Sequence, residues 1–218
     1  PGMLQAENCE VYAIAGRSME KADQFKEKYG FEKAYGSYEE LLTDPEIEAV
    51  YIPLPNTMHY EWTIKALKSG KHVLCEKPLA PTEAQAKEMF AAAEENHVYL
   101  MEAFAYQHSP YLTAIREEIK NGTIGDIRYM ESAYITSDYN KNNIRMRRDT
   151  LGGCTYDLGV YNTSLILRTL AEEPTEIRAI ASFSEEKIDK LTSVIMEYGD
   201  GKKAAFSCGM VLATDLDR

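Results

Sequence analysis

The chain has 218 residues, of which 44% are hydrophobic and 27% are charged, as is typical of a soluble globular protein with a sizeable core. Acidic residues outnumber basic ones by 35 to 24, and the net charge of −11 argues against binding to nucleic acids or to anionic membranes. The chain has no apolar run of about eighteen residues and no zinc-like spacing of its four cysteines, so we expect a cytoplasmic protein with reduced thiols, no metal site and no membrane anchor.

The first part of the chain alternates strand and helix signals. Ser18 is placed to cap the first helix, which should end near Gly30, and Ser37 forms a capping box with Glu40. Strands separated by helices predict right-handed crossovers and a parallel, doubly wound α/β sheet. The expected strands are 10–15, 31–35, 47–52, 71–75 and 97–101, and later helices cover 58–69 and 82–96.

The pattern changes near Pro110, where longer alternating strands begin. Gly199-Asp200-Gly201-Lys202 between the last two strands is a hairpin signal. This half is typical of an α+β domain with a mostly antiparallel, open sheet. Its expected helices are 111–120 and 155–171, and its expected strands are 127–135, 177–183, 192–198 and 203–210. We therefore divide the chain into domains 1–108 and 109–218.

Both ends of the chain lack a complete element. Residues 1–8 resemble the tail of a helix, and residues 214–218 stop without a closing element. We expect a fragment truncated at both ends, with the cut at its start falling in the first βα unit.

A lysine follows the strand expected at 71–75, in the sequence Glu76-Lys77-Pro78. An α/β sheet presents its ligand-binding groups beyond the carboxyl ends of its strands, which is where Lys77 should lie. Pro78 keeps the lysine backbone away from helix and permits a cis peptide bond. The pattern is compatible with an amine held over a pocket, and equally with an ordinary Lys-Pro turn.

A polar segment from Pro53 to His59 follows another buried strand and opens a helix. The free N–H groups of a helix start suit the polar groups of a ligand. The alternative reading is structural, with Asn56 capping the helix and His59 on its surface.

Arg17 and Ser18 directly follow the first strand. In a dinucleotide-binding fold an acidic residue at this place binds the ribose hydroxyls of NAD, whereas arginine accommodates the 2′-phosphate of NADP. If the fold is of this kind, Arg17 favours NADP, with NAD as the alternative. Otherwise Arg17 is a surface arginine beside a capping serine.

Gly152 and Gly153 lead into the apolar helix, on which Asp157 and Tyr161 are four residues apart and so share one face. A carboxylate and a phenol near the start of an apolar helix are candidates for a site, although a buried tyrosine bonded to an aspartate for packing is the alternative. The basic run that ends at Arg148 precedes the glycines and could reach an anionic or hydroxylated substrate.

Together these motifs resemble those of the glucose-fructose oxidoreductase/inositol dehydrogenase/MocA (Gfo/Idh/MocA) family. The tyrosine in the last motif is most similar to the branch that contains glucose-fructose oxidoreductase and dimeric dihydrodiol dehydrogenase. The motifs that carry the resemblance are Pro55-Asn56-Thr57-Met58-His59, Cys75-Glu76-Lys77-Pro78-Leu79-Ala80, Glu102-Ala103-Phe104-Ala105-Tyr106, and Gly152-Gly153 with Asp157-Leu158-Gly159-Val160-Tyr161.

The resemblance implies a Rossmann domain followed by a domain that supplies the substrate site and an oligomerisation sheet, in a homodimer or homotetramer. It implies an NAD(P)-dependent oxidoreductase acting on a sugar, a cyclic polyol or a dihydrodiol, with Lys77 as the catalytic lysine. The family's glycine-rich turn is absent from the chain, and Gln107 stands where many members carry arginine. The implied cofactor-binding residues are Arg17, Ser18, Leu54, Asn56, His59, Glu76 and Lys77, and the implied substrate-binding residues are Asp157, Tyr161 and Arg148.

A mechanism follows from these roles. A free tyrosine has a pKa of about 10, which a neighbouring ammonium should lower by favouring the phenolate. We therefore expect Tyr161 to relay the proton while Lys77 polarises the substrate oxygen and lowers the pKa of Tyr161. Asp157 would orient the substrate hydroxyls or the lysine. A sensor of sugar or NADP without catalysis and an NAD-dependent glycosidase on the same fold are the alternatives.

Overall fold

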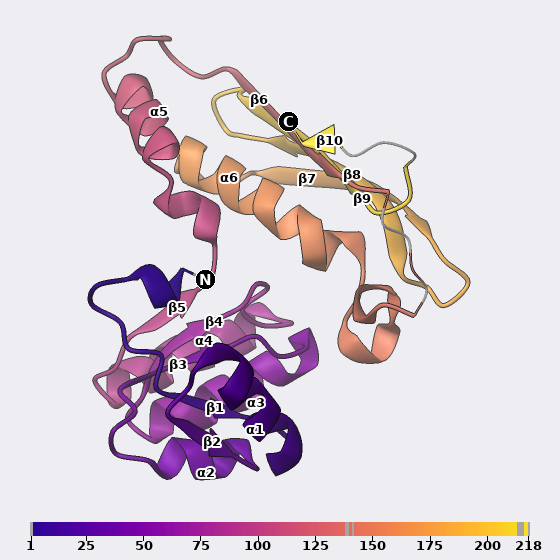
Figure 1. Ribbon diagram of the computed structural model, residues 1–218. Helices are drawn as coiled ribbons and strands as arrows, with labels where there is room; N and C mark the ends of the chain where they lie inside the picture. The colour runs from indigo at the N-terminus through magenta and orange to yellow at the C-terminus, as the bar shows by residue number, and fades with distance from the viewer. Residues whose placement is uncertain (1, 138–139, 141, 213–215, 218) are drawn as a thin grey trace. The chain divides into compact units, whose positions relative to one another are not determined.

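The computed structural model describes residues 2–137, 140, 142–212 and 216–217 (Figure 1). They divide into two compact units, and each is described by itself. The first unit consists of Pro1–Ile52, Tyr60–Cys75 and Ala84–Met101, and the second of Pro53–His59, Glu76–Glu83 and Glu102–Arg218. The residue Pro1 and most of the tail expected to lack a closing element, 214–215 and 218, lie outside the described residues.

The strands of the first unit form two small sheets. β1 (Ala13–Ala15) pairs in parallel with β2 (Lys33–Tyr35), and a second sheet has the order β3-β4-β5. β3 (Ala49–Ile52) and β4 (His72–Cys75) are parallel, and β5 (Leu100–Glu102) lies beyond β4. All five expected strands are present; each begins one to three residues later than the sequence predicted, and β5 ends one residue later.

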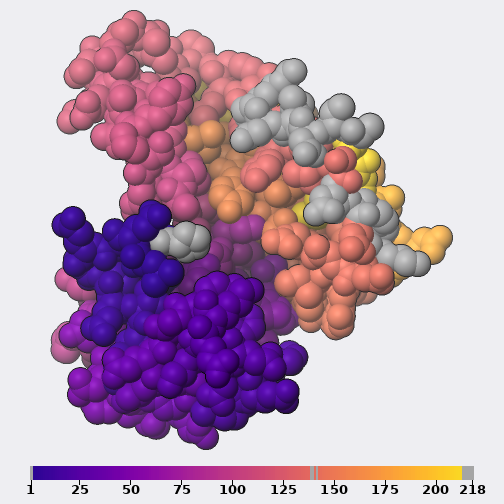
Figure 2. Space-filling view, viewed as in Figure 1, coloured from indigo at the N-terminus to yellow at the C-terminus, as the bar shows by residue number. Residues whose placement is uncertain are grey.

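Helices alternate with these strands, as expected of a doubly wound α/β fold. They are α1 (Met19–Tyr29), α2 (Tyr38–Thr43), α3 (Asn56–Lys68) and α4 (Glu83–Glu95). The predicted caps are confirmed, because Ser18 Oγ accepts the Lys21 N–H, Ser37 Oγ accepts the Glu40 N–H, and Gly30 ends α1 in the left-handed conformation. Most residues of this unit are indigo or purple in Figure 2.

Asp44 at the end of α2 is a buried anchor of the first unit. Its carboxylate accepts hydrogen bonds from the Tyr35 hydroxyl, from Lys33 Nζ at 2.9 Å and from the Glu46 N–H at 3.0 Å. These donors, led by Tyr35, lower the pKa of Asp44 to about 2, since each favours the charged carboxylate.

The second unit is built on a five-stranded sheet with the order β10-β6-β9-β8-β7. β6 and β9 are parallel and the other pairs are antiparallel, so the expectation of a mostly antiparallel sheet is confirmed. Tyr198 and Lys202 close the predicted hairpin between β8 and β9. The strands are β6 (Tyr129–Ile135), β7 (Glu176–Phe183), β8 (Asp189–Glu197), β9 (Lys203–Gly209) and β10 (Leu216–Asp217).

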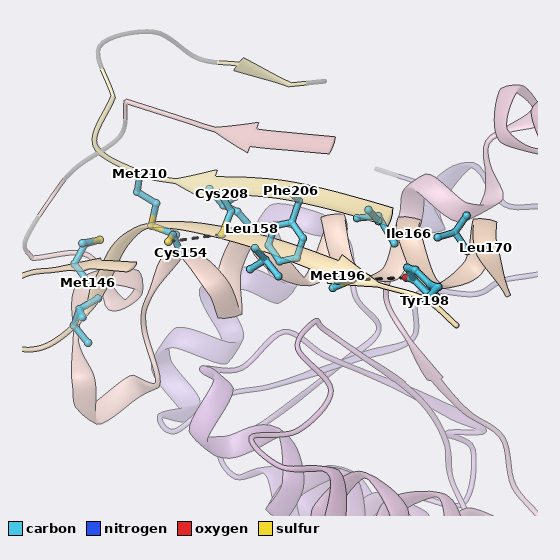
Figure 3. Packing of buried hydrophobic residues seen from close by; sticks show 13 residues of the cluster. Met146, Cys154, Leu158, Ile166, Leu170, Met196, Tyr198, Phe206, Cys208 and Met210 are labelled. Carbon is cyan, nitrogen blue, oxygen red and sulfur yellow. Dashed lines mark hydrogen bonds between the residues drawn. The ribbon is translucent and has the colours of Figure 1, made fainter. Parts of the chain in front are cut away.

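One face of this sheet packs against a helix to form the core of the second unit (Figure 3). The helix begins with a π-helical turn, Thr155–Gly159, and continues as α6 (Val160–Leu170). Buried and exposed residues alternate along β8 and β9, so every second side chain faces the helix. The other helix of this unit is α5 (Pro110–Lys120). None of the described helices combines the length and the apolar character that crossing a membrane requires.

Candidate active site

Lys77 is the centre of the candidate site. It follows β4, and its peptide bond to Pro78 is cis, as the sequence permitted. The Lys77 ammonium donates hydrogen bonds to Oδ1 and to the backbone carbonyl of Asp157, both at 2.6 Å. Only 12% of the Lys77 side chain and 15% of the Asp157 side chain are exposed, so the ion pair is largely shielded from water.

The second carboxylate oxygen of Asp157 binds an arginine. Arg145 Nε donates to Asp157 Oδ2 at 3.0 Å, so the carboxylate is held by a cation on each side. Of the two roles expected for Asp157, orienting the lysine is the one that these contacts favour. The sequence analysis selected Arg148 from the same basic run and missed Arg145. Among the residues that the structure describes, Arg148 makes no side-chain hydrogen bond or ion pair, and nothing in the sequence distinguished the two.

Tyr161 lies against Lys77 within a cluster of aromatic rings. The Lys77 ammonium is 5.0 Å from the centre of the Tyr161 ring, a distance at which a cation is attracted to the π face. Phe104, Tyr106 and Tyr134 surround the ring at centre-to-centre distances of 5.5, 6.0 and 5.6 Å. The predicted convergence of Lys77, Asp157 and Tyr161 is thus present, all within the second unit.

The expected effect of Lys77 on Tyr161 is wrong for this arrangement. Burial raises the pKa of Tyr161 to about 12, with further contributions from the nearby Glu76 and Asp157 carboxylates and from Tyr134. The Lys77 ammonium is bonded to Asp157, whose carboxylate offsets its charge. Tyr161 therefore keeps its phenolic proton at neutral pH.

The π-helical turn and the two glycines set the position of Asp157. π turns are rare and often occur at functional sites. The sequence predicted an ordinary helix here. In the structure the segment between Asp157 and Tyr161 begins within a wider, π-helical turn. A Cβ atom at Gly152 would overlap the Arg145 carbonyl, and one at Gly153 (φ +126°) would overlap Asp189 Oδ1. Both glycines thus allow the close approach of the protein's own groups.

The residues expected along a cofactor have other partners as well. Asn56 Nδ2 donates to the Leu151 carbonyl at 3.0 Å, which ties the start of α3 to the turn before Gly152. His59 is fully buried, and its ring nitrogens contact the Pro78 carbonyl at 2.8 Å and the Leu54 carbonyl at 2.7 Å. The expectation that His59 lies on the helix surface, given as the structural alternative, is wrong.

Arg17 and Ser18 line a hollow of about 530 Å³ in the first unit. It lies at the end of β1 and at the start of α1, where the helix leaves backbone N–H groups free. Its lining also includes Lys21, which the sequence analysis did not select. Two cationic side chains and a hydroxyl suit a phosphate group better than an uncharged ribose.

Comparison with known proteins places these features in a family. Residues 1–104 match the model of the Gfo/Idh/MocA oxidoreductase family described as an NAD-binding Rossmann fold, and residues 112–218 match the C-terminal domain of the same family. An uncharacterized oxidoreductase from Rhizobium meliloti is 36% identical over 99% of this chain and 64% of its own length. Trans-1,2-dihydrobenzene-1,2-diol dehydrogenase from Xenopus laevis is 35% identical over 96% of this chain and 63% of its own.

A 3-ketoreductase from Actinomadura kijaniata, solved in complex with NADP and TDP-benzene, is 31% identical in sequence. It superposes with a TM-score of 0.88 over 98% of this chain and 66% of that one. The chain thus spans less than two thirds of the length of these relatives. The two family models together cover nearly the whole chain and agree with its fold, so this chain belongs to the Gfo/Idh/MocA oxidoreductase family.

Proposed function

We propose that the protein is an NADP-dependent oxidoreductase that transfers a hydride between the cofactor and a carbon bearing a hydroxyl or carbonyl group. The proposed substrates are sugars, cyclic polyols and dihydrodiols. The convergence of Lys77, Asp157 and Tyr161 is the observation that carries the proposal. An ammonium, a carboxylate that fixes it and a phenol are the groups needed to polarise an oxygen and move its proton.

Each of these residues has a distinct task. When bound, the nicotinamide cofactor supplies or accepts the hydride. Lys77 stabilises negative charge on the substrate oxygen, and Asp157 holds the lysine in place. Because the pKa of Tyr161 is about 12, its hydroxyl is protonated at neutral pH and suits the donation of a proton to an alkoxide.

The hollow beside Arg17 supports NADP over NAD. A 2′-phosphate there would meet Arg17, Ser18 and Lys21, whereas the ribose hydroxyls of NAD would meet no carboxylate in the hollow. A charged hydrogen bond contributes about 1.5–3 kcal/mol, so Arg17→Ala should weaken NADPH binding roughly 10- to 100-fold and leave NADH binding nearly unchanged. Fluorescence titration of the two cofactors measures both affinities. An equal loss for both cofactors would contradict a 2′-phosphate role.

The proposed chemistry is tested in the protein expressed with any coding sequence that flanks residues 1–218. Tyr161→Phe and Lys77→Met should each lower kcat by roughly 10²- to 10⁴-fold while the Kd for NADPH changes little. Near-normal rates in both variants would contradict the roles of these residues. The substrate panel contains free sugars, their keto forms, dihydrodiols and glycosides. Glycoside cleavage without net NADPH turnover would indicate a glycosidase, and saturable binding without turnover would indicate a sensor.

We propose that copies of the protein associate through the face of the C-terminal sheet that α6 leaves open. Its outward-facing residues include Ile180 and Ile195, of which 82% and 52% are exposed, and their cross-strand neighbours are Ser193, Ala205 and Arg178. Exposed apolar side chains grouped on one face mark interfaces in soluble proteins. Light scattering should show a homodimer or homotetramer that Ile180→Glu dissociates. We propose a cytoplasmic location, which the free thiols of Cys9, Cys75, Cys154 and Cys208 support.

A further inference from the structure

The turn that carries Lys77 is held mainly by side chains from other parts of the second unit. Proline has no N–H, so Pro78 cannot donate to a strand or a helix. The Lys77 N–H faces the carboxylate of the preceding Glu76 at 3.3 Å. The Pro78 carbonyl and the Leu79 N–H instead meet His59 and Glu102, respectively.

His59 joins two turns that follow neighbouring strands. Its Nδ1 lies 2.8 Å from the carbonyl of Pro78, after β4, and its Nε2 lies 2.7 Å from the carbonyl of Leu54, after β3. A carbonyl can only accept, so a ring nitrogen bonds one by donating its N–H, and the tautomer of the ring decides which nitrogen donates. The ring has 0% of its surface exposed. In this arrangement it has no surface with which to contact a bound dinucleotide.

Glu102 holds the same turn by accepting a hydrogen bond from the backbone amide of Leu79. It is the last residue of β5, and its Oε1 accepts the Leu79 N–H at 2.8 Å. Burial raises the pKa of Glu102, while this hydrogen bond and the positive charges of Arg168 and Lys77 oppose the rise. The Glu102 carboxyl group is therefore partly shielded from water and is stabilised in its charged form by the Leu79 amide and by two cations.

We propose that His59 and Glu102 are positioning residues, which fix the Lys77–Leu79 turn and thereby the Lys77 ammonium against Asp157 and Tyr161. The proposal rests on the function proposed above for Lys77. The distance from Lys77 Nζ to Asp157 is 2.6 Å, so a small displacement of the turn breaks the contact. Misplacement of a reacting group by about 1 Å can cost roughly 10²-fold in rate.

The experiment compares disruptive and conservative variants at each position. Glu102→Ala removes the acceptor for the Leu79 N–H, whereas Glu102→Gln keeps an acceptor oxygen. His59→Leu removes the polar ring at similar volume, whereas His59→Gln keeps an N–H donor. Where Glu102→Ala does not fold, Glu102→Asp replaces it, because its shorter side chain withdraws the acceptor. Thermal unfolding identifies the folded variants.

Two measurements are made on each folded variant. In the cofactor-free protein, hydrogen exchange of the Leu79 amide, followed by NMR, should accelerate at least tenfold in Glu102→Ala and stay near wild type in Glu102→Gln. With NADPH and the best substrate of the panel, Glu102→Ala and His59→Leu should lower kcat by roughly 10- to 100-fold with the Kd for NADPH within twofold of wild type. The glutamine variants should recover most of that loss.

Three results would overturn the proposal. Unchanged exchange at Leu79 in Glu102→Ala would show that Glu102 does not hold the turn. A tenfold weaker Kd for NADPH with unchanged kcat in His59→Leu would make His59 a cofactor ligand. Equal kcat losses in the glutamine and disruptive variants would show no need for the donor and acceptor. If the wild-type protein turns over no substrate, the proposed function is wrong. Hydrogen exchange of the Leu79 amide still tests whether Glu102 holds the Lys77–Leu79 turn.

Discussion

The raised pKa of Tyr161 leads to a prediction that needs neither cofactor nor substrate. A rise from the ordinary value of 10 to about 12 corresponds to roughly 3 kcal/mol, the additional free energy needed to form the phenolate in this site. Burial is the largest cause and the charge of Glu76 is the second. Glu76→Gln removes the second cause only, so the pKa of Tyr161 should fall below 12 and stay above 10.

The assay is an NMR titration of the protein labelled at the tyrosine Cζ carbon, between pH 7 and pH 12. The chain has 15 tyrosines, so Tyr161→Phe assigns the resonance. Glu94→Gln, at an exposed position of α4 in the other unit, is the matched control and should leave the titration unchanged. A wild-type pKa at or below 10 would refute the account of burial and charge, and an unchanged pKa in Glu76→Gln would refute the part assigned to Glu76.

Three further predictions concern stability, each followed by urea unfolding. Because the pKa of Asp44 is lowered to about 2, its carboxylate stabilises the fold at neutral pH, and this contribution is lost as the pH falls from about 4 to about 2. Asp44→Asn should therefore be less stable than the wild type at pH 7. The difference in free energy of unfolding between the two proteins should narrow at acid pH. Burial raises the pKa of Glu102 above 4.5, so this carboxyl group ionises at a lower pH in the unfolded state than in the folded state. The free energy of unfolding should therefore fall as the pH rises above that value, and Glu102→Gln should reduce this fall. Gly153→Ala, with φ +126° and a Cβ that would overlap Asp189, should cost about 1–3 kcal/mol, whereas Gly199→Ala should change stability by less than about 0.5 kcal/mol.

Local features of the fold could be predicted from the sequence because they depend on neighbours along the chain. Ser18 and Ser37 cap their helices through N–H groups three residues later, and Gly30 ends α1 in a conformation that glycine adopts easily. The hairpin at Gly199–Lys202 follows the same logic. The π-helical turn at Thr155–Gly159 was missed, since the sequence carries no local signal that distinguishes it from the start of an ordinary helix.

The candidate site could be predicted in its members but not in its electrostatics. Lys77, Asp157 and Tyr161 were selected correctly as neighbours, because the motifs of the family carry them. The sequence does not show that Asp157 binds the lysine ammonium, or that burial of the phenol raises the pKa of Tyr161 instead of lowering it. Arg145 could not be separated from Arg148, since a guanidinium three residues away in a loop has no periodicity that would fix its direction.

The division of the first unit into two small sheets has a consequence for work on the isolated 218-residue chain. β1 and β3 are each at the edge of their sheet, and edge strands are templates for the addition of strands from other molecules. Association of this chain in solution can therefore arise at these edges as well as at the open face around Ile180. A dimer that persists in Ile180→Glu but is lost in Ile14→Lys, in β1, would be joined through the edges of the small sheets. Such a dimer would give no information about assembly through the C-terminal sheet.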